Sequence, residues 1–339
     1  MLGISECQNP LQITGPRNLA TQSIDRHLEP QLRLFLSVDV IGSTAFKQNW
    51  IDTKSNDSWF IFFESFFNDF HTKFKSCIAD HAKEDERQVD RDISPWKFMG
   101  DEIIYSIEIK KSWQALFLLK SFRSAVIEHR NEIEDSRNSV SLKATAWLAG
   151  FPVGNSVVDT PTGEDYLGPL IDTGFRLSKF ASREQMVISV DLAWYITKSD
   201  SRPDGFYLHG LETLKGVLGG RDYPIIWWDM DNALTEKMTS VGLLSKIDSA
   251  NLNKYCECFI ERAQKPLIFP FCPDDNERRP DGYDEDLKCI RKLRNSVPDD
   301  HPSIEDGESV DIQISSDKDE QAVKNAIEQT EKELNSKLS

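Results

Sequence analysis

Apolar positions along the chain follow strand and helix periods in turn. The apolar run LRLFLSVDV at 32–40 ends in the turn IGST and predicts a buried strand. Aromatic residues at helical spacing within 55–81 predict a helix with an aromatic stripe, a pattern more typical of core or dimer packing than of a cofactor site. The segment 95–109 alternates apolar and polar residues around Gly100 and Asp101, so it predicts a hairpin with this pair at its tip.

The alternation of helices and strands continues toward the C-terminus. An amphipathic helix is expected at 111–135 and a strand at 140–150. The segment 165–181 breaks at Gly168 and Pro169 and then becomes a helix. Two further strands are expected at 185–190 and 223–228. This order predicts a mixed α/β (α+β) fold in which helices pack on a sheet.

Composition divides the chain into four parts. Residues 1–31 are polar and contain several prolines, which predicts an extended arm, and 32–230 hold most of the strand and helix pattern. Residues 231–295 form a C-terminal extension. Residues 296–339 hold twelve Asp or Glu against four Lys, and so polar a segment cannot offset the chain entropy lost on folding. We therefore expect an acidic, disordered tail.

Charge and hydropathy exclude two classes of partner. The formal net charge is −16, whereas nucleic-acid binding depends on Lys and Arg. No stretch approaches the ~18 apolar residues that span a bilayer, and the start of the chain lacks the form of a signal peptide. We expect a cytoplasmic protein with no nucleic-acid or membrane partner. Its six cysteines lack the spacing of a zinc site and are expected to be free thiols.

Two carboxylates stand where predicted strands end. Asp39 lies at the end of the predicted strand 32–40, just before the IGST turn, and Asp101 lies at the predicted hairpin tip. Carboxylates presented by neighbouring strand ends can hold a pair of Mg²⁺ ions, which clamp the attacking and leaving oxygens of a phosphoryl transfer. Each Asp alone is more often a turn former, so only the pair indicates chemistry.

Four segments in order resemble the class III nucleotidyl cyclases, the family of adenylate and guanylate cyclase catalytic domains. VDVIGST at 38–44 and KFMGDE at 97–102 resemble the two metal-binding segments, and LKG at 214–216 resembles the segment with a phosphate-gripping Lys. The family pattern D-x-x-G-x-x-x-N-x-x-x-R is matched in register by Asp165, Gly168, Asp172 and Arg176. The resemblance covers 32–230 and implies a ferredoxin-like domain with a mixed, mainly antiparallel sheet flanked by helices.

The resemblance also implies a role for each matched residue. Asp39 and Asp101, with the backbone carbonyl of Val40, would bind two divalent metal ions, Mn²⁺ or Mg²⁺. Arg176 would stabilise negative charge at the α-phosphate, and its rigid fork of donors suits phosphate oxygens. Lys215 would hold the terminal phosphates of the substrate.

Two departures from the family pattern concern the substrate. Asp172 stands where the family has a ribose-positioning Asn, and an Asp keeps the acceptor but loses the donor. The purine-reading Lys of adenylate cyclases is expected five residues before Gly100, where this chain has Pro95 followed by Trp96. Proline offers neither charge nor donor. Asp165 keeps the other base-contacting position. The two departures point away from adenine as the base but do not identify another base.

An altered base pocket in a chain with SVDVIGSTAFKQ resembles the pyrimidine cyclases of the Pycsar antiphage defence system. That resemblance implies conversion of UTP or CTP, with UTP favoured, to 3′,5′-cyclic UMP or cyclic CMP plus pyrophosphate. The product would act on a separate cyclic-nucleotide-sensing effector. Trp96 and Phe46 would contact the substrate beside Asp165.

Family members split the catalytic groups across a homodimer with shared active sites. If this applies here, Asp39 and Asp101 of one subunit face Asp165, Asp172, Arg176 and Lys215 of the other. The apolar stripe of the predicted helix, at 57–74, is one candidate surface for the interface.

Two alternative functions stay open. One is an adenylate or guanylate cyclase whose altered base pocket uses other residues. The other is an inactive cyclase-like module that binds a nucleotide as a regulator. Retention of Asp39, Asp101, Arg176 and Lys215 together counts against the inactive module, because drift is expected to remove at least one of them.

Overall fold

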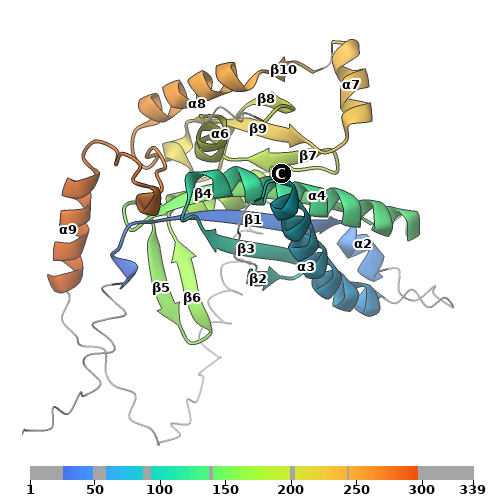
Figure 1. Cartoon of the computed structure of the whole chain (residues 1–339), viewed down its shortest axis with the longest axis horizontal. Helices are drawn as coiled ribbons and strands as arrows, with labels where there is room; N and C mark the ends of the chain where they lie inside the picture. Colours follow the sequence, from blue (N-terminus) through green and yellow to red (C-terminus); the bar gives the residue numbers. More distant parts are fainter. Residues whose placement is uncertain are drawn as a thin grey trace, which may run out of the picture. The chain divides into compact units, whose positions relative to one another are not determined.

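The strands of the protein form one large sheet and a separate hairpin in the computed structural model, which describes residues 26–48, 59–86, 93–136, 140–198, 203–242 and 244–296 (Figure 1). Most of the predicted N-terminal arm and nearly all of the acidic tail lie outside the described residues. The described residues all belong to one compact unit, Met1–Ser296. The strands of the large sheet are β1 (Gln31–Ile41), β2 (Pro95–Met99), β3 (Glu102–Glu108), β4 (Ser141–Phe151), β7 (Gln185–Ile188), β8 (Phe206–Thr213), β9 (Asp222–Asp229) and β10 (Lys246–Ile247). The hairpin pairs β5 (Ser156–Thr160) with β6 (Gly163–Leu167).

The sheet has eight strands in the order β10-β8-β9-β7-β4-β1-β3-β2. Neighbouring strands are antiparallel, except that β4 and β7 are parallel. The expected mixed, mainly antiparallel sheet is therefore confirmed. Within it, the chain order β1-helix-β2-β3-helix-β4 and the spatial order β4-β1-β3-β2 give the ferredoxin-like arrangement that the sequence predicted.

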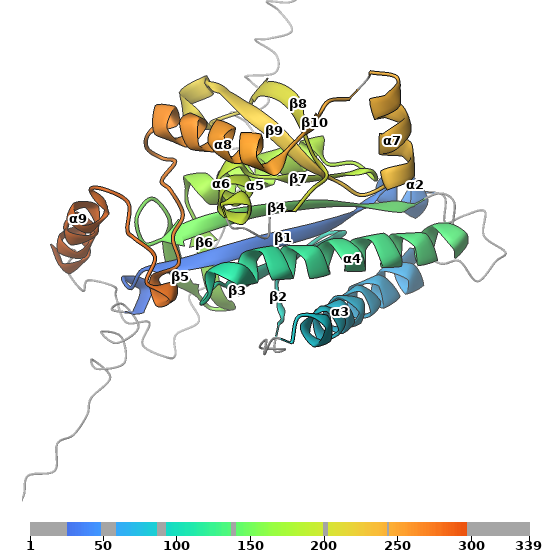
Figure 2. The ribbon, with the colours of Figure 1, turned by 45° about the horizontal axis from the view of Figure 1, so that its top comes forward.

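Two long helices, α3 and α4, lie side by side on one face of the sheet (Figure 2). Farther along the chain, α6 packs on β4 and is itself covered by α8. The helices in the described ranges are α2 (Ser43–Gln48), α3 (Trp59–Glu84), α4 (Ser112–Ser136), α5 (Pro169–Leu177), α6 (Val190–Thr197), α7 (Asn232–Ser240), α8 (Ser249–Ala263) and α9 (Tyr283–Ser296). In this part of the chain, none has the length and apolar character needed to cross a bilayer.

The aromatic stripe of α3 belongs to the core. Its buried rings meet the sheet and α4, where Phe70 and Phe74 contact Tyr105 and Phe122 edge-on or tilted at centroid distances between 5.2 and 6.4 Å. The expectation that this stripe forms a dimer surface is therefore wrong for the rings that make up most of it. The exposed apolar residues of α3 are instead at its first turn, Trp59, Phe60 and Ile61.

The two faces of β1 lead to different surroundings. Leu36 lies opposite Tyr105 and faces the α3–α4 layer. On the other face Phe35 stacks on Trp147 of β4, with ring centroids 5.3 Å apart. Because side chains alternate along a strand, Asp39 points to the same face as Phe35. The candidate chemistry therefore lies on the face opposite the two long helices.

The C-terminal extension continues the same fold. Strand β10 pairs with β8 at the edge of the sheet, and α8 buries Leu252, Cys256 and Ile260. The sequence pattern had predicted no structure there. The five cysteines that the described residues include are free thiols, as expected, and Cys7 lies outside them.

Candidate active site

Asp39 and Asp101 meet at one end of the sheet. Asp39 pairs in register with Glu102 on β3, and Asp101 lies at the β2–β3 turn, where Gly100 has a φ of 69°. That left-handed conformation suits glycine and gives a tight hairpin. At the end of β1, Gly42 (φ 81°) turns the chain into α2 beside these acids. Strand pairing therefore brings the two predicted metal-binding carboxylates together.

Burial makes this acidic group costly to ionise. It raises the pKa of Asp39 above its usual value, with the negative charge of Asp101 adding to the effect and Lys143 opposing it. Burial likewise raises the pKa of Glu102, whose carboxylate accepts a hydrogen bond from the Ser37 hydroxyl. Carboxylates held this way favour a cation between them.

Two lysines of the same chain supply positive charge to these carboxylates. Lys143 Nζ lies 3.0 Å from Asp39 Oδ2, and Lys47 Nζ lies 3.9 Å from Asp101 Oδ1. Lys143 comes from β4, directly opposite Asp39 in the strand register, whereas Lys47 comes from the short helix α2.

The donor set fits hard divalent cations. Asp39, Asp101 and Glu102 offer only carboxylate oxygens, which Mg²⁺ and Mn²⁺ accept as ligands. Val40 is buried in β1, and its role as a carbonyl ligand stays a prediction. The three carboxylates do not converge as tightly as a preformed cage. Among the described residues, the group of three whose ligand atoms all lie within 4.8 Å is His27, Asp159 and Glu164, at the arm and the β5–β6 hairpin.

Phe46 lies on α2 and packs against Phe62 of α3, with ring centroids 5.4 Å apart. It is partly buried and belongs to the rim of the core. A contact between Phe46 and a substrate stays a prediction.

Asp165 of β6 forms an ion pair that the sequence analysis missed. Lys97 Nζ of β2 donates to both of its carboxylate oxygens, at 2.7 and 2.8 Å. The expectation that this side of the site lacks a cation because of Pro95 is therefore wrong. The β2–β3 register shifts between Pro95 and Lys97, since proline cannot donate to the ladder. The order K-x-x-G-D was visible in the sequence and would have identified Lys97.

Trp96 is a packing residue. Its ring meets Phe35 and Tyr166 edge-on, at centroid distances of 5.4 and 5.0 Å, and its Nε1 donates to the carbonyl oxygen of Glu164 at 3.2 Å. The ring is therefore held between β1 and β6, and the Lys97 ammonium lies 4.5 Å from its centroid. The expected contact between Trp96 and a substrate stays a prediction.

At two glycines, the backbone of the α5 segment lies very close to neighbouring side chains. A Cβ on Gly168 would lie 2.4 Å from the Asn155 side chain, and one on Gly174 would lie 2.2 Å from the Trp147 ring. The buried Asn155 accepts a hydrogen bond from the backbone N–H of Leu170 in the first turn of α5. Both glycines therefore let the helix lie against β4 and the hairpin.

The opposite side of α5 carries Asp172 and Arg176. Both side chains are exposed, and they lie one helical turn apart. Lys215 is exposed in the connection between β8 and β9. Within the described part of the chain, no ion pair or hydrogen bond joins Arg176 or Lys215 to another side chain. The structure thus brings Asp39 close to Asp101 and pairs Lys97 with Asp165. It shows no contact between Asp39 or Asp101 and the cations Arg176 and Lys215.

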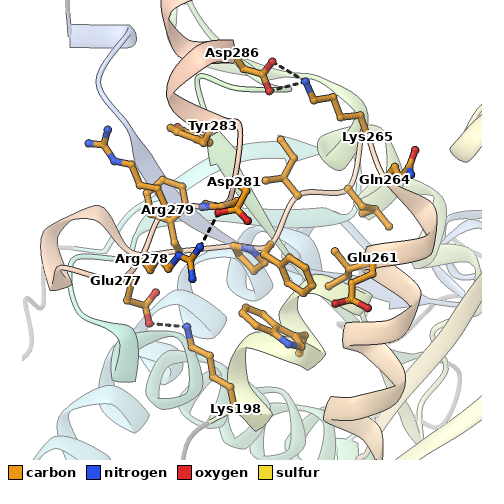
Figure 3. Close-up of a pocket in the computed structure, with 18 residues that line it drawn as sticks. Lys198, Glu261, Gln264, Lys265, Glu277, Arg278, Arg279, Asp281, Tyr283 and Asp286 are labelled. Atoms are coloured by element: carbon orange, nitrogen blue, oxygen red, sulfur yellow. Dashed lines mark hydrogen bonds and ion pairs between the residues drawn. The ribbon is translucent and has the colours of Figure 1, made fainter.

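A cavity of about 700 Å³ lies away from all of the predicted site residues (Figure 3). It is bounded by α6, α8, α9 and the segment between the last two, and ion pairs such as Lys198–Glu277 and Lys265–Asp286 line it. A smaller space of about 20 Å³ adjoins Asp191. Burial raises the pKa of Asp191 to about 6, and its Oδ2 has no hydrogen-bond partner among the described residues.

Solved cyclase domains are similar to this structure, whereas no family model and no curated protein matches the sequence. The adenylyl cyclase CyaB from P. aeruginosa is 12% identical, with a TM-score of 0.41 over 60% of this chain and 95% of that one. The guanylate cyclase domain of RhGC from Catenaria anguillulae, solved in complex with GTP, is 13% identical, with a TM-score of 0.41 over 59% and 97%. A bacterial light-regulated adenylyl cyclase is 10% identical, with a TM-score of 0.40 over 74% and 71%. Sequence identities and TM-scores this low assign neither an activity to this chain nor a role to any of its residues.

Proposed function

We propose that the chain is a nucleotidyl cyclase, which converts a nucleoside triphosphate into its 3′,5′-cyclic monophosphate and pyrophosphate. The observation that carries this proposal is the meeting of Asp39 and Asp101, beside Glu102, at one end of the sheet. A donor and acceptor pair, Lys97 with Asp165, joins the neighbouring strand β2 to the hairpin. This reaction requires carboxylates that bind metal ions and a polar pair of side chains that binds the nucleobase.

In the proposed reaction, the 3′-hydroxyl oxygen bonds to the α-phosphorus while the bond from that phosphorus to the bridging oxygen breaks. The hydroxyl proton is released, and pyrophosphate leaves. Asp39 and Asp101 would hold two divalent ions, which would supply the positive charge that this phosphoryl transfer needs. The backbone carbonyl of Val40 is proposed as a further ligand.

The remaining catalytic groups follow the matched family pattern. Arg176 is proposed to stabilise the α-phosphate, Asp172 to position the ribose and Lys215 to hold the terminal phosphates. Exposure of all three side chains supports these roles, because a ligand can reach them without disrupting an ion pair. We propose that they act on the Asp39 and Asp101 of a second copy, in a homodimer with shared sites.

We propose a pyrimidine triphosphate as the substrate, UTP ahead of CTP, on the resemblance to Pycsar cyclases. The product would then act on a separate effector in antiphage defence. Lys97 and Asp165 offer one donor and one acceptor, and every base presents an acceptor beside a donor on its pairing edge. The pair by itself therefore does not favour one base over another.

An adenylate or guanylate cyclase is the second candidate. The specific observation in its favour is Lys97, which places beside Asp165 the kind of cation expected to read a purine. This ion pair removes the argument from Pro95 against adenine, so the resemblance alone supports the pyrimidine.

One experiment tests the activity and the base together. The purified full chain is incubated with each of the four nucleoside triphosphates and Mn²⁺ or Mg²⁺, and products are identified by mass. We expect cyclic UMP, or cyclic CMP, to form fastest. Robust cyclic AMP or cyclic GMP without a cyclic pyrimidine nucleotide contradicts the base assignment, and the absence of any cyclic product contradicts the enzyme.

A further inference from the structure

Lys143 is built into the acidic end of the sheet. It lies on β4 directly opposite Asp39 of β1, so strand pairing fixes where its side chain begins. Its ammonium is 3.0 Å from Asp39 Oδ2, and both side chains are about one-quarter exposed, at 24% and 25%. The contact is a partly desolvated, charge-assisted ion pair.

This ion pair places a positive charge beside the carboxylate that a metal ion would use. A divalent ion on the same carboxylate would lie close to this ammonium, and the two positive charges would repel each other in a partly desolvated site. Lys47 is a weaker competitor, because its ammonium is 3.9 Å from Asp101 and it comes from a helix of six residues. Lys143 therefore neutralises Asp39 in the absence of metal.

We propose that Lys143 competes with the catalytic metal for Asp39 and moves to the triphosphate when metal and nucleotide bind together. This inference rests on the proposed cyclase function. A bare metal ion must bind against the repulsion of the ammonium, or displace it and leave it without a partner in a partly buried site. A metal–nucleotide complex brings phosphate oxygens that accept the displaced ammonium. Free metal consequently binds weakly, and metal and nucleotide each strengthen the binding of the other.

The first test measures Mn²⁺ binding by the nucleotide-free full chain at pH 8, from the electron paramagnetic resonance signal of unbound Mn²⁺. Lys143→Met is expected to lower the Kd about tenfold, the effect of removing a half-buried competing charge. Lys73→Met is the matched control, because Lys73 Nζ lies 2.6 Å from Glu132 on the far helical layer. The control is expected to keep the wild-type Kd within about twofold.

The second test measures coupling between metal and nucleotide. The Kd of α,β-methylene UTP, and of its adenine counterpart, is determined with and without saturating Mn²⁺. In the wild-type protein Mn²⁺ strengthens nucleotide binding strongly, and in Lys143→Met that coupling falls about tenfold. Lys143→Gln repeats both measurements with a polar side chain, in case the methionine disturbs the fold.

The outcomes separate this inference from the proposed function. An unchanged Mn²⁺ Kd in both Lys143 variants, or no Mn²⁺ binding in any protein, overturns the competition. If that result comes with a cyclic product, the cyclase proposal stands. A tighter Kd that Asp39→Asn abolishes supports the competition, and the absence of a cyclic product alongside it overturns only the cyclase.

Discussion

The two halves of the candidate site differ in how their charges are balanced. Asp39 and Asp101 each have a lysine of their own chain within 4.0 Å, and strand pairing holds the closer one in place. Arg176 and Lys215 are exposed cations with no ion pair in the described part of the chain. Lysines of the same chain partly offset the acidic half, whereas a partner for the basic half is part of the proposed function only, as a substrate phosphate or a second copy.

The largest expected effect falls on the acidic half. Asp39→Asn and Asp101→Asn are each expected to lower turnover at least ~1000-fold, because a metal contributes several kcal/mol to transition-state stabilisation. Both proteins should keep the wild-type circular dichroism spectrum. The rate is measured with Mg²⁺ and with Mn²⁺. A rate near that of the wild type for either variant would remove the acids from the mechanism.

Mixing variants tests whether the halves belong to different subunits. Asp39→Ala and Arg176→Ala are each expected to be inactive alone. Random mixing of equal amounts gives heterodimers with one intact site, and about a quarter of wild-type activity should return. Heterodimers are verified by native mass spectrometry. Verified heterodimers without activity would place both halves in one chain.

A smaller effect, on stability, is expected from a substitution in α5, the helix that carries Arg176. Gly174→Ala places a Cβ 2.2 Å from the Trp147 ring, so the free energy of unfolding should fall by about 1–3 kcal/mol. Gly150→Ala is the control, since no atom lies within 4 Å of a Cβ on Gly150. Urea titrations compare the two variants. Equal stability of both would show that α5 is not held by close packing on β4.

The smallest effect concerns Asp191, a buried carboxylate with no lysine or arginine partner among the described residues. Burial raises its pKa to about 6, so the stability from its protonated form is complete below about pH 3.8 and is lost as pH rises through 6. Asp191→Asn removes this loss, and its stabilising effect should grow by about 1 kcal/mol between pH 5 and pH 8. Thermal unfolding at the two pH values measures it. A gain independent of pH would mean that Asp191 does not titrate between pH 5 and pH 8.

The sequence pattern predicted elements whose signal is local. Strand β1, the Gly100-Asp101 hairpin and the break before α5 follow from runs of apolar residues and turn-forming glycines, and each is present. The extension was missed because α8 buries a narrow stripe in an otherwise polar helix, and that burial depends on contact with α6.

The same difference between local and long-range signals applies to the residues of the candidate site. Asp39 and Asp101 were identifiable because each ends a patterned strand. Lys143 was not, because Asp39 is 104 residues away and only the register of the sheet brings the two together. Lys97 was visible in the order K-x-x-G-D, but its pairing with Asp165, 68 residues away on the hairpin, was not. Pro95 misled the prediction, since the irregularity next to it decides which side chain reaches Asp165.

Strand β10 has a consequence for solubility. Open sheet edges recruit strands from other chains, and a very short edge strand limits such pairing. The two residues of β10 end the sheet beside β8, while α8 covers the apolar side of α6. A chain cut at residue 230 would expose the backbone of Phe206 and Tyr207, which β10 now covers, and the residues now beneath Leu252 and Ile260. Such a fragment should aggregate by edge-to-edge strand addition, so the extension protects the sheet against self-association.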